Sequence, residues 1–335
     1  MNIREQIEEK EYRDLSPYAA HSRASRGRER DESECDIRTI YQRDRDRILH
    51  SKAFRRLKDK TQVFLAPQGD HYRTRLTHTL EVSQTARTIA KALALNEDLV
   101  EAIALGHDLG HTPFGHAGEE ALNKMCPQGF AHYKQSVRVV ELLEKNGKGL
   151  NLSREVRDGI MNHRTAGIPS TLEGQVVRLC DKISYIHHDM DDAQRAGIIS
   201  EDHIPITIRV VLGASTRERL NSLIHDIIIN SYDKDCITMS EEVGEAMRAL
   251  RDLMFTDVYR SPIAKKEETK AKRMLTELYQ YYVQNSTDMS PEYRKLIRQG
   301  EPLERVVCDY ISGMSDQYSI DKFQEIFVPS GWNVE

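Results

Sequence analysis

The chain is organised around one stretch, His107-Asp108-Leu109-Gly110-His111-Thr112-Pro113-Phe114-Gly115-His116-Ala117-Gly118-Glu119. This stretch combines three histidines with an aspartate and a glutamate, the side chains that bind divalent metals and transfer protons. Gly110, Pro113 and Gly115 interrupt regular structure, which predicts a helix end, a tight turn and a new helix start. We therefore expect the rest of the chain to supply partners for this turn.

Composition indicates a soluble, helix-rich protein. The chain has 335 residues, of which 30% are charged and 39% hydrophobic, so it is long enough for one large domain or two ordinary ones. The formal net charge of -5 argues against a bulk polyanion binder. Any contact with nucleic acid or phosphate must therefore use a local basic patch.

Cysteine usage and hydropathy predict a cytoplasmic protein. The cysteines are odd in number, lie far apart and form no C-x-x-C pair, which argues against a disulfide framework or a Cys-zinc site. The first residues lack the apolar core of a signal peptide. No apolar run approaches the roughly 20 residues that span a bilayer, so we expect no contact with a membrane.

Apolar periodicity predicts an all-α fold. Helical patterns cover residues 36–60, 76–93, 97–108, 116–125, 132–145, 153–162, 170–193, 215–228, 240–256, 266–284, 291–298 and 302–313. Residues 61–65 predict a short extended piece, and residues 200–213 are ambiguous. Ser153 is expected to be an N-cap, and Ser170–Glu173 and Ser215–Glu218 match capping boxes.

Charge divides the chain into a short arm and one domain. Residues 1–35 are rich in charge and poor in large apolar groups, which predicts a solvated arm or an arm that reaches a phosphate-bearing ligand or a neighbouring subunit. We expect a single domain over residues 36–335. Its core would span about residues 60–200, followed by a helical C-terminal extension over about 200–335.

Four side chains from three predicted helices suggest a metal site, namely His78, His107, Asp108 and Asp181. Two imidazoles and two carboxylates suit Mn, Fe, Co, Ni or Zn, and Mg as well. The spacing alone leaves an alternative open, because His107 and His111 also match an H-x-x-x-H zinc pair.

A polar row on the helix predicted over 170–193 supports such a site. Asp181, Tyr185, His188 and Asp192 fall on one side of this otherwise apolar helix. Burying them is costly unless a partner such as a metal or a phosphate satisfies them.

Several segments, taken together, carry a family resemblance. They are Phe54-Arg55-Arg56-Leu57, Thr61-Gln62-Val63-Phe64, Arg75-Leu76-Thr77-His78-Thr79, residues 107–116, Asp181-Lys182-Ile183-Ser184-Tyr185 and His188-Asp189-Met190-Asp191-Asp192-Ala193. The order His78, His107-Asp108, Asp181 resembles the signature of HD-domain phosphohydrolases. Within that superfamily the segments resemble the dGTPase-like deoxynucleoside triphosphate (dNTP) triphosphohydrolases, from about residue 15 to 200.

The resemblance implies an all-α HD-type domain and a reaction. That family cleaves a dNTP between the 5′ oxygen and the α-phosphorus, which releases a deoxynucleoside and inorganic triphosphate. It implies that His78, His107, Asp108 and Asp181 hold one divalent metal ion per subunit, with Mn or Mg favoured and Fe, Co, Ni or Zn as alternatives.

The resemblance also implies roles for residues around the metal. His116 would be the general acid or base, oriented by Glu119, and His111 and His132 match further active-site histidines. The expected substrate contacts involve phosphate, sugar and base, and they are assigned to Arg75, Lys182, Tyr185, Gln62 and Arg55. Arg75 and Lys182 would neutralise the triphosphate, Tyr185 would pack on the sugar, and Gln62 would lie near base and sugar.

Partners and competing functions follow from the same resemblance. It implies a dNTP substrate with dGTP as the candidate preference, a dNTP activator, and a homo-oligomer, either a hexamer or a tetramer. Residues 23–47 are rich in arginine and would serve such contacts, and single-stranded DNA is a further candidate partner.

One alternative function is that of an HD phosphodiesterase or alarmone hydrolase, but the chain lacks their His-Asp-x-x-Glu-Asp and Gly-Tyr-Pro elements. The other alternative is a regulatory module that binds nucleotide or single-stranded DNA without turnover.

Overall fold

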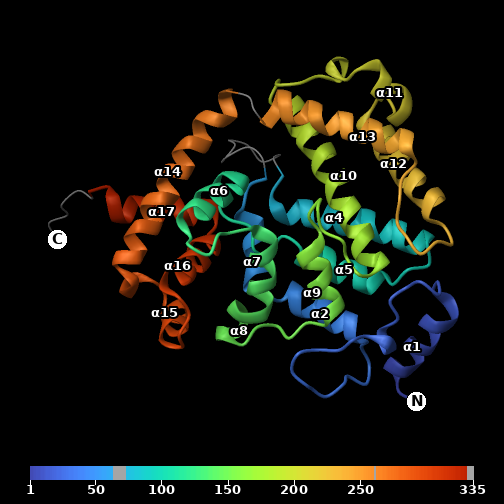
Figure 1. The fold of residues 1–335 in the computed structure, drawn as a ribbon, viewed down its shortest axis with the longest axis horizontal. Coiled ribbons are helices and arrows are strands. Elements are labelled where there is room, and N and C mark those ends of the chain that lie inside the picture. The colour runs from blue at the N-terminus through green and yellow to red at the C-terminus, as the bar shows by residue number, and fades with distance from the viewer. Residues whose placement is uncertain (63–72, 260–261, 330–335) are drawn as a thin grey trace, which may run out of the picture.

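A computed structural model describes residues 1–62, 73–259 and 262–329, and over these ranges it confirms the all-α fold (Figure 1). The α-helices are α1 (Ile3–Asp14), α2 (Ile40–Leu49), α3 (Lys52–Arg56), α4 (Arg75–Ala92), α5 (Glu97–Gly106), α6 (Gly115–Met125), α7 (His132–Arg138), α8 (Glu144–Gly147), α9 (Arg154–Asn162), α10 (Leu172–Arg195), α11 (Ile206–Leu212), α12 (Thr216–Ser231), α13 (Glu241–Met254), α14 (Pro262–Gln284), α15 (Pro291–Arg298), α16 (Leu303–Ser312) and α17 (Asp316–Phe327). Among the described residues the only β pairing is an isolated bridge between Thr61 and Thr74. None of the described helices has the length and apolar character to span a membrane.

The larger hydrophobic core forms where α2, α4, α5, α9 and α10 pack on one another. Its side chains come from the apolar faces that the sequence pattern predicts, such as Ile89 on α4, Ile103 on α5 and Val177 on α10, all fully buried. Glycine allows α9 to approach α5, because a Cβ on Gly159 would lie 2.5 Å from Cδ1 of Ile103. The ends of α4, α5, α9 and α10 are thereby held close together.

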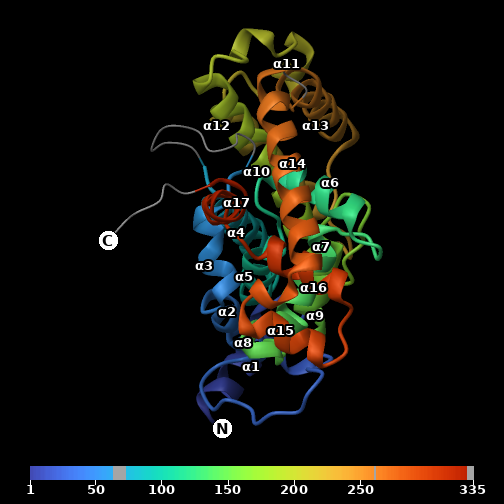
Figure 2. The same cartoon turned by 90° about the vertical axis from the view of Figure 1, so that its left-hand side faces the viewer.

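A second hydrophobic core joins α6 to the C-terminal helices α14 and α16. Leu122 on α6 is fully buried against a cluster that includes Leu275 on α14 and Ile311 on α16. Figure 1 shows α6 and α14 side by side, and Figure 2 shows α11–α13 at the opposite end of the molecule from α1. The turn from α5 into α6 therefore connects the two cores.

Two long helices predicted from the sequence are interrupted. The pattern over 36–60 forms α2, α3 and a 3-10 turn (Leu57–Asp59), because Ser51 caps the Phe54 N–H and the Glu144 carboxylate accepts the N–H groups of residues 52 and 53. The pattern over 132–145 forms α7, a π turn (Val139–Leu143) and α8. The ambiguous residues 200–213 contain helix α11. Of the short extended piece expected at residues 61–65, residues 63–65 lie outside the described part of the chain.

At the N-termini of α9, α10 and α12, the hydrogen bonds differ from those that the sequence predicts. Thr171, not Ser170, caps α10, and the buried Glu173 carboxylate instead accepts the N–H groups of Ala20 and Asn96. Ser153 stands at the N-cap of α9, but its hydroxyl makes no cap bond. Ser215 caps α12 as expected, whereas the Glu218 carboxylate binds the N–H of Ala214 instead of returning to Ser215.

The N-terminal 35 residues contain more structure than expected of a solvated arm. Helix α1 forms there, and its Asn2 and Glu5 make a capping box. Farther along, the Arg28 guanidinium donates to the carboxylate of Asp44, and both side chains are buried. The Ser25 hydroxyl donates to Glu155 on α9 at 2.8 Å. These bonds to α2 and α9 hold the N-terminal segment against the larger core.

Candidate active site

Three helices bring the four expected metal ligands together. His78 comes from the first turns of α4, His107 and Asp108 follow the end of α5, and Asp181 lies on α10. His78 Nε2 lies 3.1 Å from Asp181 Oδ1, and His107 Nε2 lies 3.7 Å from the same oxygen. One ligand atom each from His78, His107 and Asp108 lies within 4.8 Å of the others.

The chemistry of these donors fits a divalent metal ion. His107 Nδ1 bonds to the Ala104 carbonyl oxygen at 2.6 Å, which fixes the ring and leaves Nε2 buried without a hydrogen-bond partner. Burial acts to raise the pKa of the Asp181 carboxyl, but the hydrogen bond from His78 and the nearby imidazoles hold this pKa well below its usual range. An ionised carboxylate facing two imidazole nitrogens is a suitable ligand set.

A second group surrounds the Glu119 carboxylate. Glu119 accepts from His116 Nδ1 at 3.3 Å and from His132 Nδ1 at 2.9 Å. Burial opposes ionisation of Glu119, yet the bonds from His116 and His132 hold its pKa far below the usual value. Burial also acts to lower the pKa of His132, but the bond to Glu119 produces a net rise. Glu119 is therefore a charged acceptor that stabilises the protonated form of His132.

The remaining histidine of the turn lies between the two groups. The His111 ring stacks on the His132 ring with centroids 4.7 Å apart, and it is buried. Burial and the nearby Arg75 hold the pKa of His111 well below its usual range. A neutral imidazole is therefore expected at this position.

One histidine that the sequence analysis did not assign to the site also belongs here. His163 Nε2 lies 3.3 Å from His132 Nε2, and its ring packs 5.1 Å from that of His107. Its Nδ1 bonds to the Ile160 carbonyl oxygen at 2.7 Å, and burial lowers the pKa of His163 to about 4. His163 caps α9 as His107 caps α5, and each Nδ1 bonds to the carbonyl oxygen three residues earlier. The sequence signal that could have pointed to His163 is its position directly after the end of a predicted helix.

Close approaches fix the shape of the turn. A Cβ on Gly110 would lie 2.1 Å from the Ser136 backbone nitrogen, and one on Gly118 would lie 2.1 Å from the Pro113 oxygen. The Ser136 hydroxyl donates to the His107 carbonyl at 2.7 Å and accepts from the Gly110 N–H at 2.9 Å. Helix α7 therefore supports the turn while it supplies His132.

These groups line a cavity of about 510 Å³. Predicted site residues on its wall are Gln62, Arg75, His78, Asp108, His111, His116, His132, Asp181, Lys182 and Tyr185. His107 and Glu119 contact residues of this wall from behind. The cavity is also lined by residues that the sequence analysis did not single out, including His163, Arg164, Arg251, Phe255 and Glu268.

Two of the arginines predicted to bind substrate, Arg75 and Arg55, lie in very different places. Arg75 is buried and its Nη1 lies 2.6 Å from Asp108 Oδ2, so it pairs with a candidate metal ligand. Arg55 is exposed and lines a different cavity with Arg47 and Lys52, so the structure does not bring it to this site. The sequence could not show this, because the direction of Arg55 depends on the break between α2 and α3.

Comparisons with known proteins agree with this geometry. The HD domain family matches residues 75–186, which include all four candidate ligands, and a phosphohydrolase-associated domain matches residues 237–325. A relative from Caldanaerobacter subterraneus subsp. tengcongensis is 58% identical over 333 residues, covering 99% of this chain and 98% of that one. Its name is deoxyguanosinetriphosphate triphosphohydrolase-like protein.

The chain belongs to the deoxyguanosinetriphosphate triphosphohydrolase-like family.

Other members of this family are similar over nearly the whole chain. A relative of the same name from Clostridium perfringens (strain SM101 / Type A) is 49% identical and covers 98% of each chain. Among solved structures, a phosphohydrolase from Bacteroides thetaiotaomicron aligns with a TM-score of 0.54 at 18% identity, over 84% of this chain and 67% of that one. That likeness supports the fold.

Proposed function

We propose that this hydrolase cleaves dNTPs at the bond between the 5′ oxygen and the α-phosphorus. The observation that carries the proposal is the convergence of His78, His107, Asp108 and Asp181 beside a cavity that is also lined by His116, the partner of Glu119. The names of its relatives, which mention deoxyguanosine triphosphate, support dGTP as the candidate preference.

The residues of the cavity have complementary roles in this proposal. A divalent ion held by the four ligands supplies Lewis-acid polarisation of a phosphoryl oxygen and lowers the pKa of bound water. Arg75 and Lys182 would neutralise phosphate charge, and Tyr185 and Gln62 line the same cavity, where they would contact sugar and base.

The histidines would handle the proton. Water loses one proton and adds its oxygen to the α-phosphorus, the bond to the 5′ oxygen breaks, and the 5′ oxygen takes up a proton to become a hydroxyl. His116 is exposed on the cavity wall and bonded to Glu119, so it is placed to deliver this proton. His111 and His132 lie beside it and contact the transferred triphosphate.

Product analysis tests the proposal. The protein is incubated with each dNTP and with GTP, in Mn or Mg, and the products are separated by chromatography. We expect deoxynucleoside and triphosphate from at least one dNTP and slower turnover of GTP. Release of orthophosphate or pyrophosphate would contradict the proposal. Binding of dNTP without turnover would favour the regulatory module.

The finer expectations stay predictions. These are the choice of Mn or Mg, the cytoplasmic location, the homo-oligomer, the dNTP activator and the single-stranded DNA partner. Pairing with Asp44 and Glu155 already occupies Arg28 and Arg26, which leaves fewer arginines of this segment for such contacts.

A further inference from the structure

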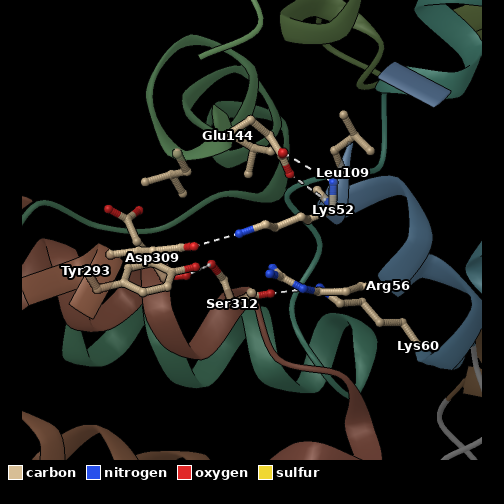
Figure 3. A pocket seen from close by; sticks show the side chains of 13 residues that line it. Lys52, Arg56, Lys60, Leu109, Glu144, Tyr293, Asp309 and Ser312 are labelled. Atoms are coloured by element: carbon tan, nitrogen blue, oxygen red, sulfur yellow. Dashed lines mark hydrogen bonds and ion pairs between the residues drawn. The ribbon is translucent and has the colours of Figure 1, made fainter. Parts of the chain in front are cut away.

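Two ionisable side chains are buried where the C-terminal helices meet the turn, and neither belongs to the proposed chemistry. The first is Lys60, whose side chain lines a pocket separate from the substrate cavity. Its Nζ donates to the carbonyl oxygen of His111 at 2.5 Å and to that of Ser312, the last residue of α16, at 2.7 Å. Figure 3 shows Lys60 and Ser312 at a pocket that Tyr293 and Asp309 also line. Lys60 thus joins the turn to the end of α16.

The second ionisable side chain is Asp316, the first residue of α17, which is only 4% exposed. Its Oδ1 accepts the backbone N–H of Phe114 at 3.0 Å. Its Oδ2 accepts the N–H of Thr61 at 3.0 Å and the Thr61 hydroxyl at 2.5 Å. One carboxylate from α17 therefore joins two segments that are distant from it in sequence.

The Phe114 bond falls at a strained point of the backbone. Phe114 has φ 59° and ψ 30°, a left-handed conformation that non-glycine residues adopt at a cost. It stands at the N-cap of α6 without any side-chain cap bond, and it lies between His111 and His116. A residue held in this conformation sets the direction in which α6 and its His116 leave the turn.

Thr61 carries the same constraint to the neighbouring Gln62, which also lines the cavity. Thr61 precedes Gln62 and pairs with Thr74, the N-cap of α4. The Lys60 carbonyl oxygen also accepts the Arg75 N–H at 2.9 Å. Residues 60 and 61 therefore contact α4, the turn, α16 and α17 at once.

We infer that Asp316 and Lys60 are positioning residues, through which the C-terminal helices fix the backbone of residues 111–114 and so aim His111 and His116 into the cavity. This inference rests on the proposed function for its effect on turnover. It gives the phosphohydrolase-associated segment a part in completing the active site, although none of its atoms at this contact faces the substrate cavity.

The test compares Asp316→Asn with Asp321→Asn. The amide that replaces the carboxylate at position 316 would turn a donor toward Phe114 or Thr61, which are donors themselves. Asp321 lies on the same helix, is exposed and bonds only to the Gln317 amide in the described structure, so it controls for the loss of charge. Hydrogen exchange by mass spectrometry, metal content, kcat and KM are measured for each variant.

For Asp316→Asn we expect exchange to accelerate about tenfold in peptides over residues 111–118, and kcat to fall about tenfold or more. KM and metal content should stay close to wild type, and Asp321→Asn should match wild type in every measure. Lys60→Met removes the other contact and should give the same local pattern; it also decides the question if Asp316→Asn does not fold.

Three results would overturn the inference. These are unchanged exchange over 111–118, faster exchange spread evenly over the chain, which shows general destabilisation, and locally faster exchange with unchanged kcat. A wild-type protein that releases no triphosphate from any dNTP would contradict the proposed function instead. The exchange measurements would still decide whether the two residues hold the turn.

Discussion

Replacing Glu119 by glutamine should lower kcat. The carboxylate bonds to His116 Nδ1 at 3.3 Å, and to His132 Nδ1 and the His132 N–H at 2.9 Å each. Glutamine keeps the size but loses the charge, and its amide directs a donor at one of these donors. A charge-assisted hydrogen bond contributes about 1.5–3 kcal/mol, so losing the one to His116 predicts a fall in kcat of about 10- to 100-fold.

The neighbouring residue offers a matched control. Glu120 lies on the same helix and is exposed, and it pairs with Lys124 at 2.6 Å and Lys272 at 2.5 Å. Glu120→Gln should leave kcat within about twofold, since exposed ion pairs contribute only about 0–1 kcal/mol. Steady-state assays of triphosphate release measure both variants at saturating metal. Equal kcat for Glu119→Gln and wild type would refute the role given to Glu119.

Three further predictions follow from the geometry. Asp108→Ala should lose bound metal and turnover together, which elemental analysis and product assays measure, and retained turnover would reject the ligand assignment. Arg55→Ala should leave kcat and KM for dNTP unchanged because Arg55 lines another cavity, so a large rise in KM would count against this placement. Gly110→Ala should lower the free energy of unfolding in urea by about 1–3 kcal/mol or more, because its Cβ would collide with the Ser136 backbone. Gly244→Ala, where only a contact of 3.9 Å forms, should instead be neutral or stabilising.

Much of the site could be predicted from the sequence because it is concentrated in short segments. His107 and Asp108 are adjacent, and Asp181 and Tyr185 share one face of a helix, so local periodicity already groups them. Nothing local links His78 to residues about thirty positions away, and the family resemblance gave the stronger support for its place among the ligands. The structure then brought all four expected ligands together.

The parts that could not be predicted depend on tertiary contacts. His163 faces His132 only because α7 and α9 pack together, and Arg55 lies away from the site on α3, a new helix that Ser51 begins after α2 has ended. Glu173 lies in a capping-box pattern, but it is drawn to two N–H groups from remote segments. Asp316 contacts Phe114 across 202 positions, and no pattern in a single sequence indicates such a bond.

The most direct test of the proposed reaction is to identify which bond of the substrate breaks. Wild-type protein is incubated with dGTP and Mn in water enriched in oxygen-18, and the products are examined by phosphorus NMR and mass spectrometry. Attack at the α-phosphorus predicts triphosphate carrying one oxygen-18 and an unlabelled deoxynucleoside. Labelled deoxynucleoside, or label in orthophosphate or pyrophosphate, would contradict the proposed reaction.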